Sequence, residues 1–202
     1  MADVRHLIIF GGQGAGKGTQ AKLLAKRYGL IYLGTGESFR ELAGETTPMG
    51  KRVKDILEQG NLVPNDLTDQ IVALKLGEIP PSVGFILDGY PRNLSQAKNF
   101  HHTLSGLDRL IPKPIFLNLR VPREEQLTRL RKRRYTEGRY DDTEAGIAQR
   151  LKIYDEHTKP VLEAVKDWAE VVRINGNQSV EAVTKEIVNK VEAASRSKQE
   201  DA

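Results

Sequence analysis

A glycine-rich loop near the N-terminus constrains the fold of this chain more than any other feature. The sequence Gly-Gly-Gln-Gly-Ala-Gly-Lys-Gly-Thr occupies residues 11–19 and directly follows the apolar run Leu7–Phe10. Apolar side chains that can face a core then recur with helical spacing, at Ala21, Leu23, Leu24 and Tyr28, before Gly29. A strand, a glycine loop and a helix in this order predict one strand–helix unit of a parallel sheet.

The loop has the pattern of a P-loop, because residues 11–17 read Gly-x4-Gly-Lys. Glycines allow several backbone N–H groups to turn toward an anion, and the N-terminus of the following helix adds partial positive charge. Lys17 would supply a full charge to the β- and γ-phosphates of a nucleotide. Gly18 stands where most P-loops place Ser or Thr, and the hydroxyl is displaced to Thr19, which weakens the case for a direct magnesium ligand here. A glycine turn that only helps the helix to pack is the alternative, and the enclosed Lys17 argues against it.

Five short apolar runs have the length and composition of buried strands. They are Leu7–Phe10, Leu30–Leu33, Phe85–Leu87, Ile115–Leu119 and Val171–Ile174. Longer stretches with helical spacing separate them, so strands and helices alternate along the chain. This pattern predicts an α/β fold in which helices cover both faces of a five-stranded parallel sheet, a three-layer sandwich formed by residues 1–202 as one domain.

Two stretches show the helical spacing clearly, and two others interrupt the alternation of strands and helices. One predicted helix begins after Ser179, its N-cap, and has an apolar stripe at residues 180, 183, 187, 188 and 191. A second predicted helix follows Val121-Pro122. It carries Glu124 and Glu125 in its first turn and has Leu127 and Leu130 on its buried side. Residues 35–63 have helical spacing without a convincing strand and predict a helical insertion. Apolar residues vanish between residues 132 and 142, which predicts a second, shorter insertion.

Composition limits the classes of function. The chain has 202 residues, of which 39% are hydrophobic and 29% charged, as in an ordinary globular protein. No apolar run approaches the 18 residues of a membrane span, and the N-terminus lacks the features of a signal peptide, so we expect a cytoplasmic protein that does not enter a membrane. The absence of cysteine excludes disulfides, thiolate zinc sites and cysteine nucleophiles, and the four histidines lack metal-ligand spacing.

The net charge of +4 is concentrated in the run Arg129–Arg134, with Arg139 shortly after it. A cluster this local suits a compact triphosphate at least as well as a nucleic acid, and composition does not decide between them. A nucleic-acid-binding module therefore stays an alternative, although the aromatic residues on which bases would stack are sparse around the run.

Candidate catalytic side chains follow the third strand and the basic run. Asp88 ends the apolar strand 85–88, where a carboxylate can orient Mg²⁺ through its water shell, and Arg92 leaves the next loop at the carboxyl edge of the sheet. Arg129 and Arg133 are four residues apart and share a helix face, while Arg139 and Arg150 follow. Phosphoryl transfer needs positioned cations more than a general base, but each of these arginines could equally belong to a solvated helix face.

Taken together, the residues of this chain resemble the adenylate kinase family along nearly its whole length. The matches are Gly14-Ala-Gly-Lys-Gly-Thr-Gln20, Gly34-Thr-Gly-Glu37 with Arg40, Gly60-Asn-Leu-Val63, Asp88-Gly-Tyr-Pro-Arg92 with Gln96, Arg139-Tyr-Asp-Asp142, and Arg150-Leu151 with Tyr154. Lys-Gly-Thr-Gln after a P-loop is specific to nucleoside monophosphate kinases and accounts for Gly18. The resemblance implies the P-loop NTPase fold and reversible transfer of a phosphoryl group from MgATP to AMP, which gives two ADP and balances the adenine nucleotides.

The resemblance also implies roles for individual residues. Those that would bind ATP are Gly14, Ala15, Gly16, Lys17, Gly18, Thr19, Arg129, Arg133 and Gln178. Those that would bind AMP are Thr35, Gly36, Arg40, Asn61, Leu62, Val63, Gly89, Tyr90, Pro91, Arg92, Gln96, Arg139 and Arg150. Catalysis would rest on Lys17, Asp88, Arg92, Arg133, Arg139 and Arg150.

Further implications concern the insertions and the metal. Residues 34–63 resemble the AMP-binding insertion, and residues 132–142 resemble a short ATP lid that lacks the four cysteines of zinc-bearing relatives. Mg²⁺ would be held by ATP and by waters, with Asp88 behind the waters and no direct protein ligand. We expect a monomer, as is common for short-lid relatives.

Two alternatives to this reaction remain open. The related UMP/CMP kinases resemble the chain too, because Asn93 stands where adenylate kinases usually have threonine. Thr35, Gly36 and Gln96 instead match the adenine-binding pattern, in which a side-chain amide pairs with the N1/N6 face of the base. A P-loop switch or ATPase would hydrolyse nucleotide without an acceptor.

Overall fold

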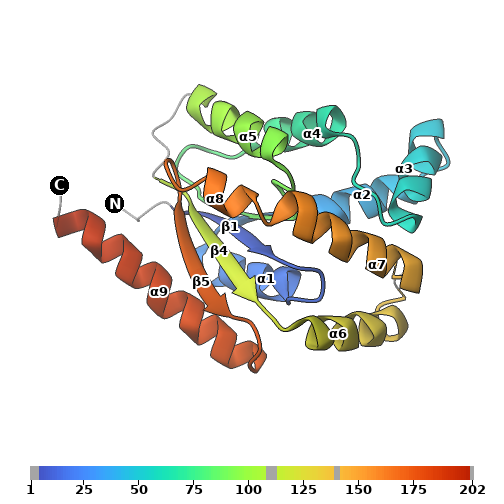
Figure 1. The fold of residues 1–202 in the computed structure, drawn as a ribbon. Coiled ribbons are helices and arrows are strands. Elements are labelled where there is room, and N and C mark those ends of the chain that lie inside the picture. The colour runs from blue at the N-terminus through green and yellow to red at the C-terminus, as the bar shows by residue number, and fades with distance from the viewer. Residues whose placement is uncertain (1–4, 108–112, 139–141, 201–202) are drawn as a thin grey trace.

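The computed structural model describes residues 5–107, 113–138 and 142–200. The strands β1 (His6–Gly11), β2 (Ile31–Gly34), β3 (Phe85–Asp88), β4 (Ile115–Arg120) and β5 (Glu170–Asn175) form one sheet in the order β2-β3-β1-β4-β5 (Figure 1). Every pair is parallel, with Ile9 of β1 opposite Asp88 on one side and Leu117 on the other. The predicted parallel sheet is therefore confirmed, and each predicted strand lies within one residue of the observed bounds.

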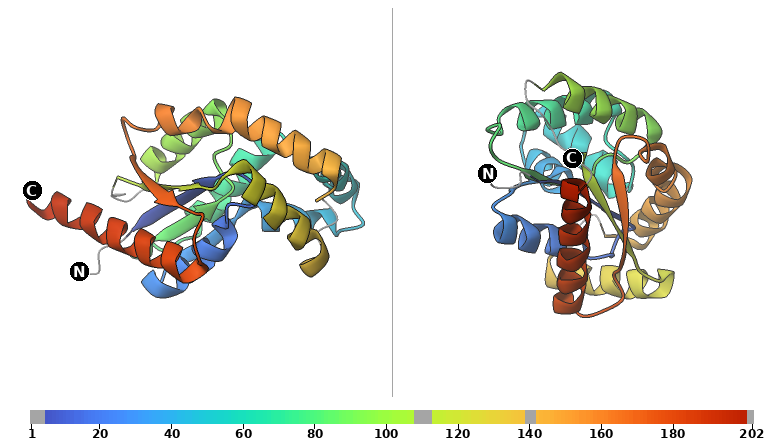
Figure 2. Two further views of the ribbon diagram at one scale, coloured as in Figure 1. Left: turned by 60° about the horizontal axis from the view of Figure 1, so that its bottom comes forward. Right: turned by 90° about the vertical axis from the view of Figure 1, so that its left-hand side faces the viewer.

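Two helical layers cover the sheet, because alternate residues of each strand face opposite sides. Leu7 and Ile9 pack with α1 (Lys17–Tyr28) and α9 (Val180–Glu200). Ile8 and Phe10 pack instead with α4 (Asn65–Gly77), α5 (Leu94–Gly106) and α8 (Val161–Ala164). Figures 1 and 2 show the sheet between these layers. The three-layer α/β sandwich is thus confirmed.

The predicted helical insertion consists of α2 (Thr35–Ala43) and α3 (Pro48–Glu58). Phe39, Ala43, Val53 and Val63 give it a small core of its own. Thr47 caps α3 by accepting a hydrogen bond from the Gly50 N–H, and Pro48 suits the first helical turn. The insertion can therefore hold its shape as a lobe beside the sheet.

The remaining helices are α6 (Arg123–Thr136), α7 (Glu144–Ile153) and the π-helical turn η1 (Tyr154–Thr158). Leu130 of α6 packs with Ile147 and Leu151 of α7 in a small cluster. In Figure 1, α3, α6 and α7 lie together on the side toward which the arrow of β4 points. They therefore surround the edge of the sheet at which α/β proteins bind ligands.

Two side chains differ from their predicted burial. Leu23 is 41% exposed and Val180 is 44% exposed, whereas Leu24 and Val183 on the same helices are buried. Each exposed residue lies at the border of an apolar stripe, where spacing alone does not decide burial. The Ser179 N-cap is confirmed, because its Oγ accepts a hydrogen bond from the Ala182 N–H. Within the described ranges, no helix combines the length and the apolar character that crossing a membrane requires.

Candidate active site

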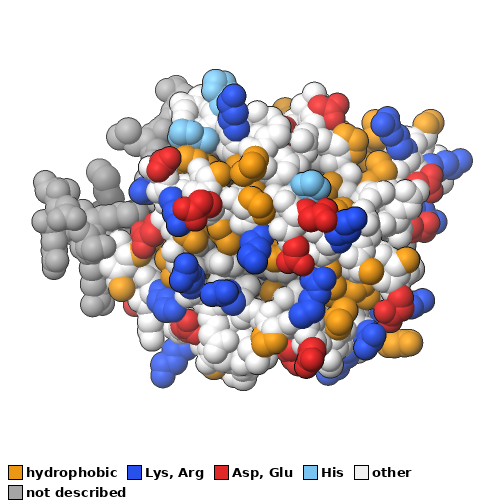
Figure 3. Space-filling view, in the orientation of Figure 1, with side chains coloured by type: hydrophobic (Ala, Val, Ile, Leu, Met, Phe, Trp, Pro, Cys, Tyr) orange, Lys and Arg blue, Asp and Glu red, His pale blue; other side chains and the backbone are white. Residues whose placement is uncertain are grey.

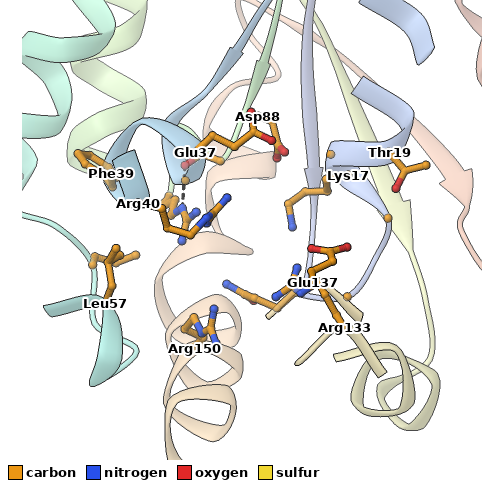
Figure 4. Close-up of a pocket in the computed structure, with 18 of the residues that line it drawn as sticks. Lys17, Thr19, Glu37, Phe39, Arg40, Leu57, Asp88, Arg133, Glu137 and Arg150 are labelled. Atoms are coloured by element: carbon orange, nitrogen blue, oxygen red, sulfur yellow. Dashed lines mark hydrogen bonds between the residues drawn. The ribbon is translucent and has the colours of Figure 1, made fainter. Parts of the chain in front are cut away.

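A cavity of about 560 Å³ lies at the carboxyl edge of the sheet, where β1 and β3 end. Its wall includes the loop after β1, the end of β3, the helical insertion and the last turns of α6. Figure 4 shows Lys17, Arg133 and Arg150 entering the same space from three different elements, with Asp88 and Glu37 together at another part of the wall. The fold therefore brings side chains from distant parts of the sequence to one place.

The glycine loop contacts α6, and this contact explains why residue 14 is glycine. Gly14 has φ of +77°, and a Cβ added there would lie 2.7 Å from the backbone oxygen of Gln126. Only glycine fits this backbone conformation at this distance. The next helix, α1, has no side-chain cap and no acidic residue in its first turn. Its first N–H groups are therefore available to an anion, as a phosphate site requires.

Lys17 lies across the loop in this structure. Its Nζ donates hydrogen bonds of 2.9 Å to the carbonyl oxygens of Gly11 and Gly12. Burial lowers the pKa of Lys17 from 10.5 to about 8; Asp88 opposes this shift, and the guanidinium groups of Arg92, Arg133 and Arg150 add to it. A bound polyphosphate would reverse this balance, because its negative charge favours the ammonium form.

Asp88 is the carboxylate at the end of β3. Burial raises the pKa of Asp88, while the positive charges of Lys17 and Arg92 oppose the shift. Thr35 donates a hydrogen bond of 3.2 Å to the Asp88 carbonyl oxygen and so joins the start of α2 to this strand end. Asp88 therefore lies between the glycine loop and the helical insertion.

Asp142 holds two of the candidate arginines. Its side chain is fully buried, and it accepts bonds of 2.7 and 2.9 Å from Nε and Nη2 of Arg133. It also accepts a bond of 2.6 Å from Nη2 of Arg150, whose Nε donates to the Gly146 carbonyl. Paired guanidinium groups of this kind keep their charge and their direction.

Seventeen of the residues named from the sequence lie in the wall of the cavity. They are Gly14, Gly16, Lys17, Gly18, Thr19, Gly36, Arg40, Asn61, Leu62, Val63, Asp88, Gly89, Arg92, Gln96, Arg129, Arg133 and Arg150. The structure does not bring Ala15, Thr35, Tyr90, Pro91 or Gln178 to this wall. Arg139 lies outside the described residues.

The residues away from the wall have structural contacts of their own. Ala15 and Tyr90 are each 2% exposed, and the Tyr90 hydroxyl donates to Asp69 at 2.7 Å. Gln178 donates to the Asn175 carbonyl and to Glu186. Arg129, which does line the cavity, donates to Glu125 at 2.7 Å and to the Gly176 carbonyl at 3.1 Å. This last contact joins α6 to the loop before α9.

Sequence reasoning missed several members of the wall. Asp142 lies in the segment 139–142 that resembles the family, but no separate role was predicted for it. Two adjacent aspartates beside a basic run are the sequence signal that could have indicated a partner for the arginines. Phe39 and Leu57 line the cavity from the insertion, yet in the sequence they look like any core residue. Lys22 and Glu37 form an ion pair of 2.7 Å between α1 and α2, which no local pattern predicts.

Comparison with known proteins agrees with this geometry. Residues 9–170 match the family model described as adenylate kinase. The chain belongs to the adenylate kinase family. The adenylate kinase of Prochlorococcus marinus strain AS9601 is 38% identical over 187 residues, which cover 93% of this chain and 98% of that protein. The adenylate kinase of Mycobacterium ulcerans strain Agy99 is 43% identical over 158 residues, or 78% and 84% of the two chains.

A third family member, the adenylate kinase of Kocuria rhizophila strain DC2201, is 37% identical over 191 residues, which cover 93% of this chain and 98% of that protein. The resemblance noted in the sequence is thereby confirmed, and with it the assignment of the chain to the phosphotransferases. Asn93, the residue that resembles the UMP/CMP kinases, caps α5 by accepting a hydrogen bond from the Gln96 N–H. Its side chain therefore has a structural role in this fold.

Proposed function

We propose that this chain transfers the terminal phosphoryl group of MgATP to AMP and regenerates both from two ADP. The observation that carries the proposal is the cavity in which Lys17, Arg92, Arg133 and Arg150 line one space, between the phosphate loop and the helical insertion. Four cations around one space suit the facing phosphate groups of two nucleotides, whose negative charges would otherwise repel each other. ATP would lie on the loop side and AMP on the side of residues 36–63.

The reaction requires no covalent enzyme intermediate. An oxygen of the AMP phosphate would attack the terminal phosphorus of ATP, and the bond to the bridging oxygen of ADP would break. Charge spreads over the transferred group, so Lys17, Arg133 and Arg150 would stabilise it, while Arg92 orients the acceptor phosphate. Lys17 has three N–H donors and can therefore keep one loop contact while it follows the transferred group.

Mg²⁺ would enter together with ATP. A Cβ added at Gly18 would lie 3.4 Å from Oδ2 of Asp88, so this carboxylate stands beside the first turn of α1. Among the described residues, no group of three His, Cys, Asp or Glu side chains is placed to hold a metal ion. We assign the ion to ATP oxygens and waters, as the family resemblance implies, with Asp88 orienting the waters. Bound there, Mg²⁺ would neutralise phosphate charge.

The two insertions would close over the nucleotides and exclude water, which otherwise competes as an acceptor. We assign residues 34–63 to the AMP-binding insertion and residues 132–142 to the short lid. Residues 132–136 continue α6, so movement of the lid would carry the last turns of this helix. The proposal also includes Arg139 as a phosphate contact, and a monomer that acts on free nucleotides in the cytoplasm.

A coupled assay of ADP formation tests the proposal. ATP is supplied with AMP, CMP, UMP or GMP in separate reactions, and AMP should be the preferred acceptor. Preference for CMP or UMP would favour a UMP/CMP kinase, and phosphate release without an acceptor would favour an ATPase. Lys17→Met and Arg92→Ala should each lower kcat by orders of magnitude while the melting temperature changes little. Near-normal turnover in either variant would contradict the assignment.

The nucleic-acid alternative has a separate test. Figure 3 shows Lys and Arg side chains interspersed with Asp and Glu on this face of the molecule. Several of the basic residues near the cavity are paired with carboxylates, including Arg129 with Glu125 and Arg131 with Glu144. Tight, salt-dependent binding of oligonucleotides would revive that alternative.

A further inference from the structure

Three side-chain amides meet where α4 and α5 begin. Oε1 of Gln96 accepts a hydrogen bond of 2.8 Å from the Arg92 N–H, and Oδ1 of Asn93 accepts one of 2.9 Å from the Gln96 N–H. The NH₂ groups of Asn93 and Gln96 both donate, at 2.9 Å, to a single atom, Oδ1 of Asn65. Gln96 is 2% exposed and forms part of the cavity wall.

The orientation of all three amides follows from two backbone donors. A backbone N–H can only donate, so the atom of Gln96 that faces the Arg92 N–H must be its oxygen. The same holds for the atom of Asn93 that faces the Gln96 N–H. Both NH₂ groups then point toward Asn65, which must offer its oxygen to them. Turning the Gln96 amide by 180° would oppose donor to donor at Arg92 and acceptor to acceptor at Asn65.

This orientation leaves Gln96 with one hydrogen on Nε2 and one acceptor site on Oε1. The adenine edge has an acceptor at N1 beside a donor at N6, and the two groups of Gln96 complement it. Hypoxanthine has nearly the same size and shape, but a donor at N1 beside an acceptor at O6. It would pair with Gln96 only if the amide turned and gave up its contacts with Arg92 and Asn65.

We propose that Asn65 is a specificity-determining residue, which does not contact the base but holds Gln96 in the orientation that accepts AMP. The inference rests on the proposed function, because it concerns the acceptor site of that reaction. The proposal predicts that the acceptor site distinguishes adenine from hypoxanthine by hydrogen-bond pattern and not by size. Asn65 would thereby link base choice to the start of α4, two residues after the expected AMP contact Val63.

The test compares AMP with inosine 5′-monophosphate (IMP) as acceptor, since the two bases differ only at this edge. The measured quantity is the ratio of kcat/KM for AMP to kcat/KM for IMP, in the full-length protein with saturating MgATP. Asn65→Leu removes the acceptor at similar volume and should lower the ratio about tenfold, mainly through a higher KM for AMP. The KM for ATP should stay unchanged, whereas a general structural defect would change it as well.

Two further variants separate the acceptor from other effects of Asn65. Asn65→Asp keeps an oxygen for both NH₂ groups, so its ratio should stay within about threefold of the wild type. Asn93→Asp keeps the cap on α5 but places a second oxygen against Asn65, whose amide should turn to donate to it. The turned amide opposes the NH₂ of Gln96, so the ratio should fall although residue 65 is unaltered.

The outcomes are distinct. If the wild-type protein forms no ADP from ATP and AMP, the proposed function fails. If it forms ADP but Asn65→Leu and Asn93→Asp keep the wild-type ratio, the function stands and the inference is overturned. Asn65→Asp losing the ratio as fully as Asn65→Leu would also overturn it. Should Asn65→Leu fail to fold, Asn93→Asp decides alone, because aspartate is as good an N-cap as asparagine.

Discussion

Replacing Asp142 by asparagine would remove the negative charge that holds Arg133 and Arg150 in place. The Asp142 side chain is fully buried, and its partners Arg133 and Arg150 are 25% and 10% exposed. Asparagine keeps one oxygen but turns an NH₂ group toward guanidinium donors, so buried positive charge loses its counterion. Removing one partner of a buried pair costs about 3–5 kcal/mol, and the partial exposure of Arg133 reduces this to about 2–4 kcal/mol.

The matched control is Asp155→Asn. Asp155 pairs with Arg123 at 3.3 Å, and both side chains are about half exposed. Such surface pairs contribute at most about 1 kcal/mol. For a chain of this length, about 1 kcal/mol shifts the melting temperature by about 2–4 °C. We therefore expect Asp142→Asn to lower it by about 5–15 °C and Asp155→Asn to change it only slightly.

Thermal unfolding and the ADP-forming assay measure the two consequences separately. Because Asp142 also directs Arg133 and Arg150, its replacement should lower kcat by at least about tenfold at temperatures where the variant stays folded. Equal melting temperatures for Asp142→Asn and the wild type, together with unchanged kcat, would refute the reasoning that this carboxylate holds the two arginines in place.

Three other predictions follow from the contacts described. Because the pKa of Lys17 is about 8 without nucleotide, part of this lysine is neutral above pH 8 and must take up a proton when a triphosphate binds. Calorimetry of ATP binding at pH 8.5 should therefore detect proton uptake that is absent at pH 6.5, and equal heats in buffers of different ionisation enthalpy would exclude it. Gly60 has φ of +73°, and its added Cβ would lie 2.5 Å from the Gly146 carbonyl, so Gly60→Ala should raise the KM for AMP and lower stability, whereas Gly77→Ala, in open space, should not. Gln20→Ala removes two hydrogen bonds to α9, of 2.8 and 2.9 Å, and should lower the free energy of unfolding by about 1–3 kcal/mol in a denaturant titration; a loss below about 0.5 kcal/mol would show that α9 docks without them.

Local chemistry made much of the fold predictable. Strands appear where apolar runs are short, helices where apolar spacing is near 3.6, and the glycine loop fits only between a strand and a helix. Lys17 and Asp88 could be predicted because the loop after β1 and the end of β3 lie at the same edge of any parallel sheet. The arginines of α6 were found because residues four apart on a helix share a face.

The sequence by itself thus determined the class of fold, the glycine loop and the main candidate cations, since each is encoded by neighbours along the chain. The tertiary structure alone decided which candidates share a wall. It joined Asn65 to Gln96, 31 residues away, buried Asp142 between two arginines, and kept Tyr90 and Gln178 off the cavity. Such contacts depend on how helices from separate segments pack on the sheet, and the separation of two residues along the chain does not predict that packing.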